Sequence, residues 1–207
     1  MPITQTLADF RHKVTQCDNL IVNSHKVDLQ GNAVLPELDK QQITAAAFLN
    51  LFIAWEEFLE QALTDFMVGE PTMNGSVPMK YVSPIDRKAA GAMMIGVMRY
   101  FDYAQYDNVR KIAGIYFDRG YPFEPILSGI VADLQDSRTV RNACAHISTS
   151  TQSALEALAV RIFGQPRRGI TVYQLLTAID PRVGATGTVF ATYRDKLVTA
   201  AELIANG

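Results

Sequence analysis

The chain has 207 residues, of which 48% are apolar and 19% charged, and its formal net charge is −2. This length and apolar content suffice for one sizeable hydrophobic core, which indicates a globular protein with a single domain. The small negative charge argues against a protein that coats nucleic acid by bulk electrostatics, so any nucleic-acid site has to be local.

Two long helices are predicted in the N-terminal third. Residues Ile3–Gln30 place apolar side chains at loose helical spacing, and Gly31 and Asn32 indicate the end of that helix. Residues Leu38–Val68 repeat apolar side chains every three or four positions, with acidic residues between them, which is typical of an amphipathic helix. We expect the two helices to pack antiparallel.

Proline and glycine interrupt the middle of the chain. Residues Gly69–Pro84 have few periodic apolar positions and are predicted to form the main loop. Ser83 then resembles an N-cap, with Pro84 at the first helical position, for a helix that runs to about Tyr100. A further helix is expected over Asp107–Phe117.

The C-terminal half is also predicted to be helical. Helices are expected over Pro125–Asp136, from about Arg138 onward with Ser137 as its N-cap, over Ala154–Phe163, over Val172–Ile179 and over Val189–Ala205. Ser148–Thr151 is interpreted as a polar interruption, and Gly184–Gly187 as a turn because it lacks the Lys-Ser/Thr pair of a phosphate-binding loop. No alternating run is long enough to require a strand, so the predicted fold class is all-α, an antiparallel helical bundle.

The hexapeptide Arg141-Asn-Ala-Cys-Ala-His146 is the most informative segment. It places a permanent cation, an amide and an imidazole within about one and a half helical turns. Asn142 and His146 are four residues apart and are expected to share a helix face. Arg141 lies to one side of that row, and Arg138 extends it backwards. Side chains of these types, aimed one way, are suited to binding a phosphate.

The charge around the hexapeptide is unlike that of the whole chain. Residues Gln135–Ile170 contain five arginines and two acids, a local charge of +3 in a protein of net charge −2. This asymmetry favours an anion-binding site near the hexapeptide.

Residue by residue, the hexapeptide resembles the Arg-x4-6-His signature of the HEPN superfamily of helical nucleotide-binding domains, in the form Arg-Asn-x-x-Ala-His. Residues Phe48–Glu60 also resemble the aromatic and acidic early helix of several prokaryotic HEPN families. The resemblance covers about Leu38–Gly164. It implies a single HEPN-like domain over residues 1–207, with a core at about 38–164 and a C-terminal helical extension over 165–207.

The resemblance also implies an activity. In HEPN ribonucleases the motifs of two protomers face each other across a two-fold axis, and RNA is cut between them. Arg141 and His146 would be the catalytic pair, and Asn142 and Arg138 would bind the substrate. We therefore expect a homodimeric, metal-independent endoribonuclease in which the 2′-hydroxyl of the RNA attacks, leaving a 2′,3′-cyclic phosphate. Such an enzyme would act as a toxin or defence effector, with a cognate antitoxin or regulatory protein as partner.

Two other interpretations predict the same helices but no catalytic activity. The protein would then be a non-catalytic HEPN-like module that binds nucleotide or RNA or regulates another protein, or a structural adaptor in which Arg141 and His146 serve an interface. For Arg141 the structural alternative is an ion pair with an acid such as Glu57, Glu60 or Asp136.

Two further groups of residues have simpler explanations than a functional site. Glu56 and Glu60 share a helix face and, with Glu57, would be able to hold a metal or to fix the motif arginine, but a solvated face explains them better. The aromatic-rich stretch Tyr100–Phe123, interleaved with arginines, would be able to stack bases, but core packing and dimer contacts explain it better.

No metal, cofactor or membrane partner is expected. His12 and His25 have no partner at ligand spacing, and Cys17 and Cys144 form no Cys-x-x-Cys pair. The longest apolar run, Phe48–Trp55, is far shorter than the roughly 20 residues that span a bilayer. The N-terminus has no basic-then-apolar signal pattern, so we expect a cytoplasmic protein.

Overall fold

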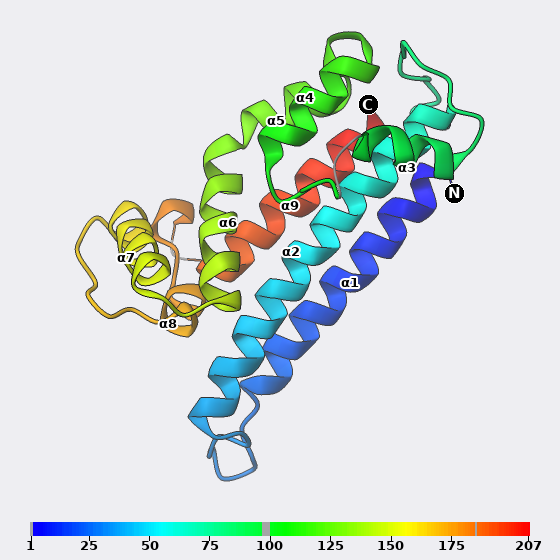
Figure 1. Cartoon of the computed structure of the whole chain (residues 1–207). Coiled ribbons are helices and arrows are strands. Elements are labelled where there is room, and N and C mark those ends of the chain that lie inside the picture. Colours follow the sequence, from blue (N-terminus) through cyan, green and yellow to red (C-terminus); the bar gives the residue numbers. More distant parts are fainter. Residues whose placement is uncertain (1, 97–99, 185) are drawn as a thin grey trace. The chain divides into compact units, whose positions relative to one another are not determined.

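The structure is a computed structural model that describes residues 2–96, 100–184 and 186–207. These residues form nine α-helices and two short 3-10 turns, and they contain isolated bridges but no strand (Figure 1). The α-helices are α1 Ile3–Ser24, α2 Glu37–Val68, α3 Arg87–Ile95, α4 Tyr106–Tyr116, α5 Phe123–Gly129, α6 Val131–Ala145, α7 Thr149–Phe163, α8 Val172–Thr177 and α9 Val189–Asn206. The predicted all-α class is confirmed. Of the helices described, none combines the length and apolarity needed to cross a membrane.

The chain divides into two compact units. The first contains Met1–His12, Ala54–Val131 and Leu197–Gly207, and the second contains Lys13–Ile53 and Ala132–Lys196. The division falls inside α1, α2 and α9, each of which contributes residues to both units, and it also separates Val131 from the rest of α6.

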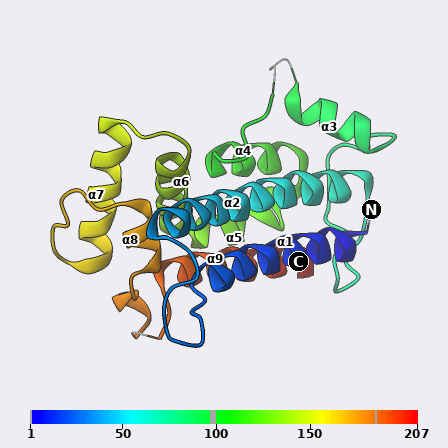
Figure 2. The same cartoon turned by 90° about the horizontal axis from the view of Figure 1, so that it is seen from below.

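In the first unit, the start of α1 lies beside the second half of α2 (Figures 1 and 2). The ring of Phe10 contacts those of Trp55 and Phe58, with centroids 6.2 and 5.4 Å away. One turn earlier in α1, the hydroxyl of Thr6 donates a hydrogen bond to the buried carboxylate of Asp65, at 2.7 Å. Because the earlier residue of α1 meets the later residue of α2, the two helices are antiparallel here, as predicted.

In the second unit, the first half of α2 packs against the first half of α9. The ring of Phe48 lies edge-on to those of Phe190 and Tyr193, with centroids 6.2 and 6.3 Å away, and all three side chains are buried. The segment predicted as a C-terminal extension therefore supplies large side chains to the core of this unit.

The end of α1 differs from its prediction. The helix stops at Ser24 rather than near Gln30. The carboxylate of Asp28 accepts hydrogen bonds from the backbone N–H groups of Gln30 and Asn32, at 2.9 and 2.8 Å, and so closes a turn. An aspartate that satisfies nearby backbone donors competes with helix formation, and this explains the earlier stop.

The start of α3 also differs. The helix begins at Arg87, because the carboxylate of Asp86 caps it by accepting the N–H of Ala89 at 2.7 Å. The predicted cap Ser83 is wrong, since the chain reaches a better-placed side-chain acceptor three residues later. Residues 97–99 of the predicted helix lie outside the described residues, as does residue 185 of the predicted turn Gly184–Gly187.

Candidate functional site

The predicted site residues lie in the second unit, at the C-terminal end of α6. This helix begins at Val131, so the predicted start near Arg138 is wrong, and the helix predicted over Pro125–Asp136 is replaced by the shorter α5. The break between the two falls at Ile130, whose backbone leaves the helical region. Ser137 is buried inside α6 and caps nothing.

His146 follows α6 by one residue. Its backbone N–H donates to the carbonyl oxygen of Asn142 at 2.9 Å, which is the bond that an α-helix makes between residues four apart. The backbone of His146 is therefore still bonded to the last turn of α6, and the shared face of the Asn142 and His146 side chains stays a prediction.

A capping box fixes the backbone just beyond His146. The hydroxyl of Thr151 donates to the carbonyl oxygen of His146 at 2.8 Å and accepts the N–H of Ser148 at 3.0 Å. The hydroxyl of Ser148 in turn accepts the N–H of Thr151 at 3.2 Å. α7 therefore starts at Thr149, and the predicted start at Ala154 is wrong. The Ser-x-x-Thr spacing of Ser148 and Thr151 was the signal in the sequence for this cap.

The side chains of the motif differ in their exposure to solvent. His146 is exposed, and no ring nitrogen of it bonds to any residue in the described part of the chain. Arg141 and Asn142 are half-buried, and Nη1 of Arg141 donates to Oδ1 of Asn142 at 3.4 Å. The Nε of Arg141 is enclosed and has no hydrogen-bond partner within the described residues. A cation, an amide and an imidazole thus stand together at one helix end.

The structural alternative for Arg141, an ion pair with Asp136, is wrong. The carboxylate of Asp136 instead accepts hydrogen bonds from Arg161 at 2.5 Å and from the hydroxyl of Tyr193 at 3.1 Å. Nη1 of Arg182 lies 3.7 Å from the same carboxylate. Glu57 and Glu60 belong to the first unit, and an ion pair of either with Arg141 stays a prediction.

This network around Asp136 ties α6 to α7 and α9. Burial raises the pKa of Tyr193, and the adjacent carboxylate of Asp136 raises it further, so the phenol stays protonated and donates. Arg182 pairs with the buried Asp180 and lies over the ring of Tyr193, with its guanidinium carbon 5.4 Å from the ring centroid. These contacts hold the helix that carries the motif.

The local excess of arginine survives this pairing. Of the five arginines in residues 135–170, Arg161 is neutralised by Asp136. The other four form no ion pair within the described residues of the second unit: Arg138, Arg141, Arg167 and Arg168. The positive charge predicted near the motif is therefore available to an anion.

Cys144 lies between the motif residues, and the pKa of its thiol argues against a role as a nucleophile. Burial raises the pKa of its thiol to about 12, and the positive charge of Arg141 offsets only part of that effect. Burial likewise raises the pKa of Cys17 to about 11, with a further contribution from Asp18. Both thiols are therefore protonated near neutral pH, as expected for structural cysteines.

The structure adds little support for a functional role of the glutamates of α2 or of the aromatic stretch. Burial raises the pKa of Glu60, and the charge of Glu57 adds to the shift. No group of three or more His, Cys, Asp or Glu residues that would be able to hold a metal occurs within residues 2–96, 100–184 and 186–207. In the aromatic stretch, Phe117 and Phe123 are core residues whose rings contact each other, whereas Tyr100 is exposed.

No protein-family model, curated protein or solved structure matches this chain. The assignment to the HEPN superfamily therefore stays a prediction that depends on residues Arg141–His146 and their helical setting.

Proposed function

We propose that the protein is an endoribonuclease of the HEPN type, with Arg141 and His146 as the catalytic pair. The observation that carries this proposal is the exposed imidazole of His146, one turn beyond the half-buried Arg141 and Asn142, at a helix end. Within the described residues of the second unit, the guanidinium of Arg141 has no carboxylate partner, so its charge is available to a phosphate.

Each motif side chain has a distinct role in this mechanism. Arg141 binds the scissile phosphate and stabilises the negative charge that grows on it in the transition state. His146 transfers a proton to or from the attacking 2′-hydroxyl or the leaving 5′-oxygen, which an imidazole does well near neutral pH. Oδ1 of Asn142 accepts from Arg141, so its amide nitrogen remains to donate to the phosphate. Arg138 binds the substrate one turn earlier.

The chemistry requires a second copy of the chain. Attack and departure at one phosphorus each need a proton transfer, and one protomer supplies one motif histidine. A two-fold homodimer with both motifs at its axis supplies two. Ile147, beside His146, is 98% exposed, and an apolar side chain at that position suits a contact between copies.

The biological role follows from the activity. An unrestrained endoribonuclease harms its own cell, so we propose a toxin or defence effector held in check by an antitoxin or regulatory protein. The 2′-hydroxyl of the RNA serves as nucleophile, so the mechanism needs no metal-activated water.

Incubation of the purified protein with total RNA in a chelator tests this proposal. The wild-type protein should cut RNA, and His146→Ala should not. His12→Ala, the same change at another exposed histidine, is the matched control and should retain full activity. A wild-type protein that leaves RNA intact, or a His146→Ala variant that cuts at the wild-type rate, would refute the proposal.

The unpaired arginines also favour a second candidate function, a module that binds RNA or nucleotide without cutting it. Charge on Arg138 and Arg141 suffices for binding, whereas only cleavage needs His146. In that case the protein binds RNA, the RNA remains intact, and His146→Ala leaves the affinity unchanged.

A further inference from the structure

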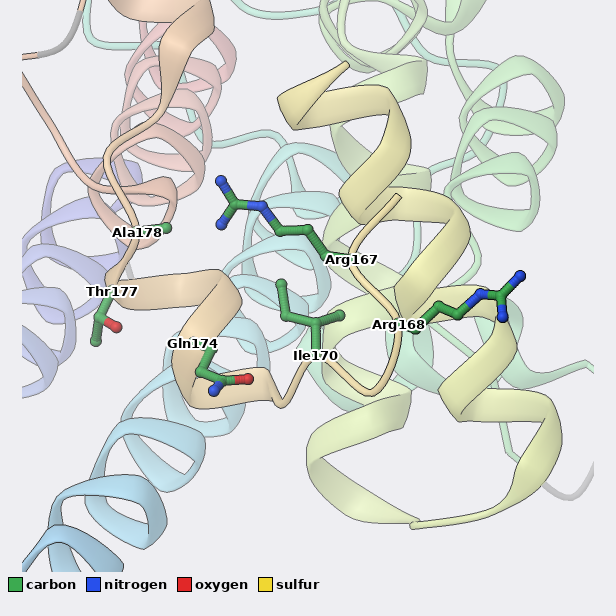
Figure 3. A pocket seen from close by; sticks show the side chains of 6 residues that line it. All are labelled: Arg167, Arg168, Ile170, Gln174, Thr177 and Ala178. Carbon is green, nitrogen blue, oxygen red and sulfur yellow. The ribbon is translucent and has the colours of Figure 1, made fainter. Parts of the chain in front are cut away.

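A pocket of about 430 Å³ opens beside the loop that joins α7 to α8 (Figure 3). It is lined by Arg167, Arg168, Ile170, Gln174, Thr177 and Ala178. The lining contains two cationic side chains, an amide and a hydroxyl, and it contains no carboxylate. All of these residues lie in the second unit, as the motif does. The charge and polarity of the lining suit an anion.

Arg167 is the cation that faces the pocket. In Figure 3 its side chain extends across the pocket toward Ala178, whereas Arg168 extends in the opposite direction. The guanidinium carbon of Arg167 lies 3.6 Å from the centroid of the Phe163 ring. Stacking on the ring orients the planar guanidinium and leaves its N–H edge for a ligand. Arg167 forms no ion pair within the described part of the chain that would compete for that edge.

Hydrogen bonds within the protein fix the loop that carries Arg167, without a contribution from a ligand. The carboxylate of Glu156 accepts the N–H of Gly169 at 2.7 Å and the amide of Gln152 at 3.2 Å. The same amide donates to the carbonyl oxygen of Ile170 at 3.1 Å. The N–H of Gly169 holds the pKa of Glu156 below its usual value, followed by the amide of Gln152, so the carboxylate remains ionised near neutral pH. A site fixed in this way loses little entropy on binding.

The amide of Gln174 is the group on the α8 side that complements a phosphate. Oε1 of Gln174 accepts the N–H of Thr171 at 3.0 Å, so Nε2 is the donor that this amide has left. The hydroxyl of Thr177 donates its proton to the carbonyl oxygen of Tyr173 at 2.8 Å, so it contributes no donor to the pocket. A guanidinium with an amide donor beside it matches the negative oxygens of a phosphate.

Neighbouring residues of α7 connect this pocket to the motif. Thr151 bonds to the carbonyl oxygen of His146, and Gln152, the next residue, bonds to that of Ile170 in the pocket wall. The first turn of α7 therefore contacts both sites. A single strand of RNA bound at the motif has a second cationic position close by.

We propose that the Arg167 pocket binds a backbone phosphate of the RNA strand whose scissile phosphate lies at Arg141. This proposal rests on the proposed function, because it assigns a second contact to the same substrate. A phosphate is also present on free nucleotides, so the experiment has to separate the two sources.

Salt-dependent RNA binding tests the proposal directly. The probe is a fluorescent, uncleavable 2′-O-methyl RNA of about 12 nucleotides, a length in the range that single-strand sites cover. Its affinity is measured by anisotropy for the full chain, for Arg167→Gln and for Arg168→Gln. The two variants lose the same charge at adjacent positions, so bulk electrostatics affects them alike.

Loss of one phosphate contact on a single strand lowers the slope of log affinity against log salt by about 0.7. We expect that change for Arg167→Gln, with affinity reduced about five- to tenfold at moderate salt. Arg168→Gln should keep the wild-type slope. Equal losses in both variants would show diffuse attraction, and no loss in either would show no contact, and each result overturns the proposal.

A second variant guards against misfolding of Arg167→Gln. Ala178→Glu places a carboxylate opposite Arg167, and it should weaken RNA binding to a similar degree. Wild-type RNA affinity in both folded variants overturns the proposal.

Titration with adenosine 5′-monophosphate and with inorganic phosphate separates the sources. Arg167-dependent binding of the mononucleotide, with RNA affinity unaffected, assigns the pocket to free nucleotides and overturns the RNA assignment. If RNA binds through Arg167 and is never cut, the proposed nuclease activity fails and the pocket stands. If RNA is cut and Arg167 has no effect on binding, only the pocket fails.

Discussion

The hydroxyl of Thr151 donates a hydrogen bond to the carbonyl oxygen of His146, 2.8 Å away, across the turn between α6 and α7. The hydroxyl oxygen of Thr151 also accepts the N–H of Ser148, so the Thr151 side chain joins the cap of α7 to the residue proposed as proton donor and acceptor. Thr151 is therefore a positioning residue: it touches no substrate in the proposed mechanism, yet it fixes the backbone that carries the imidazole.

Thr151→Val should lower kcat for RNA cleavage by about tenfold, because the backbone at His146 loses its anchor. It should lower the free energy of unfolding by about 1 kcal/mol, the usual cost of a lost helix cap. Thr151→Ser keeps the hydroxyl and should restore kcat. Single-turnover cleavage and urea unfolding measure the two effects. If Thr151→Val lowers stability and leaves kcat unchanged, Thr151 is only a helix cap.

Arg141→Lys should reduce kcat/KM by about 100-fold, which is in the range for loss of one donor to the transition state. Lysine keeps the charge, but it loses the planar fork that binds two phosphate oxygens and the donor to Oδ1 of Asn142. Arg138→Lys is the matched control, and its proposed role in binding makes a change below about fivefold the expectation. Initial rates of cleavage of a short RNA measure kcat/KM for both variants. Equal effects of the two substitutions would contradict the separate roles.

Asp136→Ala should destabilise the protein by about 3 kcal/mol, because it removes the acceptor of Arg161 and of the buried Tyr193 hydroxyl, and the carboxylate that lies 3.7 Å from Arg182. Arg161→Ala should cost less than about 1 kcal/mol, since the Arg161 side chain is 56% exposed. Urea unfolding measures both. Comparable losses for the two variants would mean that the network contributes less than its burial indicates.

Ile147→Asp should convert the proposed dimer into monomers and abolish cleavage, because it places a charge on each side of the two-fold axis. The exposed Val22→Asp is the control, with the same polarity change on a different helix, α1. Sedimentation velocity at micromolar concentration measures the mass. A wild-type monomer, or a dimer that Ile147→Asp leaves intact, would rule out the assembly around the motif.

Helical periodicity was sufficient to predict the longest elements. The three-and-four spacing of apolar residues over Leu38–Val68 and Val189–Ala205 matches α2 and α9 to within one residue at each end. These helices bury a continuous apolar stripe, so the apolar pattern is long and fits a helix better than any other secondary structure. Helix starts were harder, because several capping residues compete locally. Asp86 caps α3 in place of Ser83, and Ser137 is buried inside α6.

The candidate site also has a part that the sequence predicts and a part that it does not. Arg141, Asn142 and His146 come from one short segment, so helical geometry alone brings them together. Their surroundings depend on residues far apart in the sequence. The pairing of Asp136 with Arg161 and Tyr193, and the position of Arg167 in a pocket with Ala178, follow from packing that no local pattern contains.

The proposed reaction also predicts the chemical ends of the products. Arg141 supplies fixed charge and His146 supplies proton transfer, so the remaining requirement is a nucleophile, and the 2′-hydroxyl next to the scissile phosphate is already in place. Attack by that oxygen breaks the bond to the 5′-oxygen, and the products carry a 2′,3′-cyclic phosphate and a 5′-hydroxyl.

Cleavage should therefore persist in EDTA, and a single 2′-deoxy substitution at the cut position should block it, while the same substitution one nucleotide away should not. Mass spectrometry of the products and sequencing gels test these points. A requirement for magnesium, or equal cleavage of DNA, would contradict the mechanism and direct attention to Glu56, Glu57 and Glu60, whose carboxylates lie close together in sequence on α2.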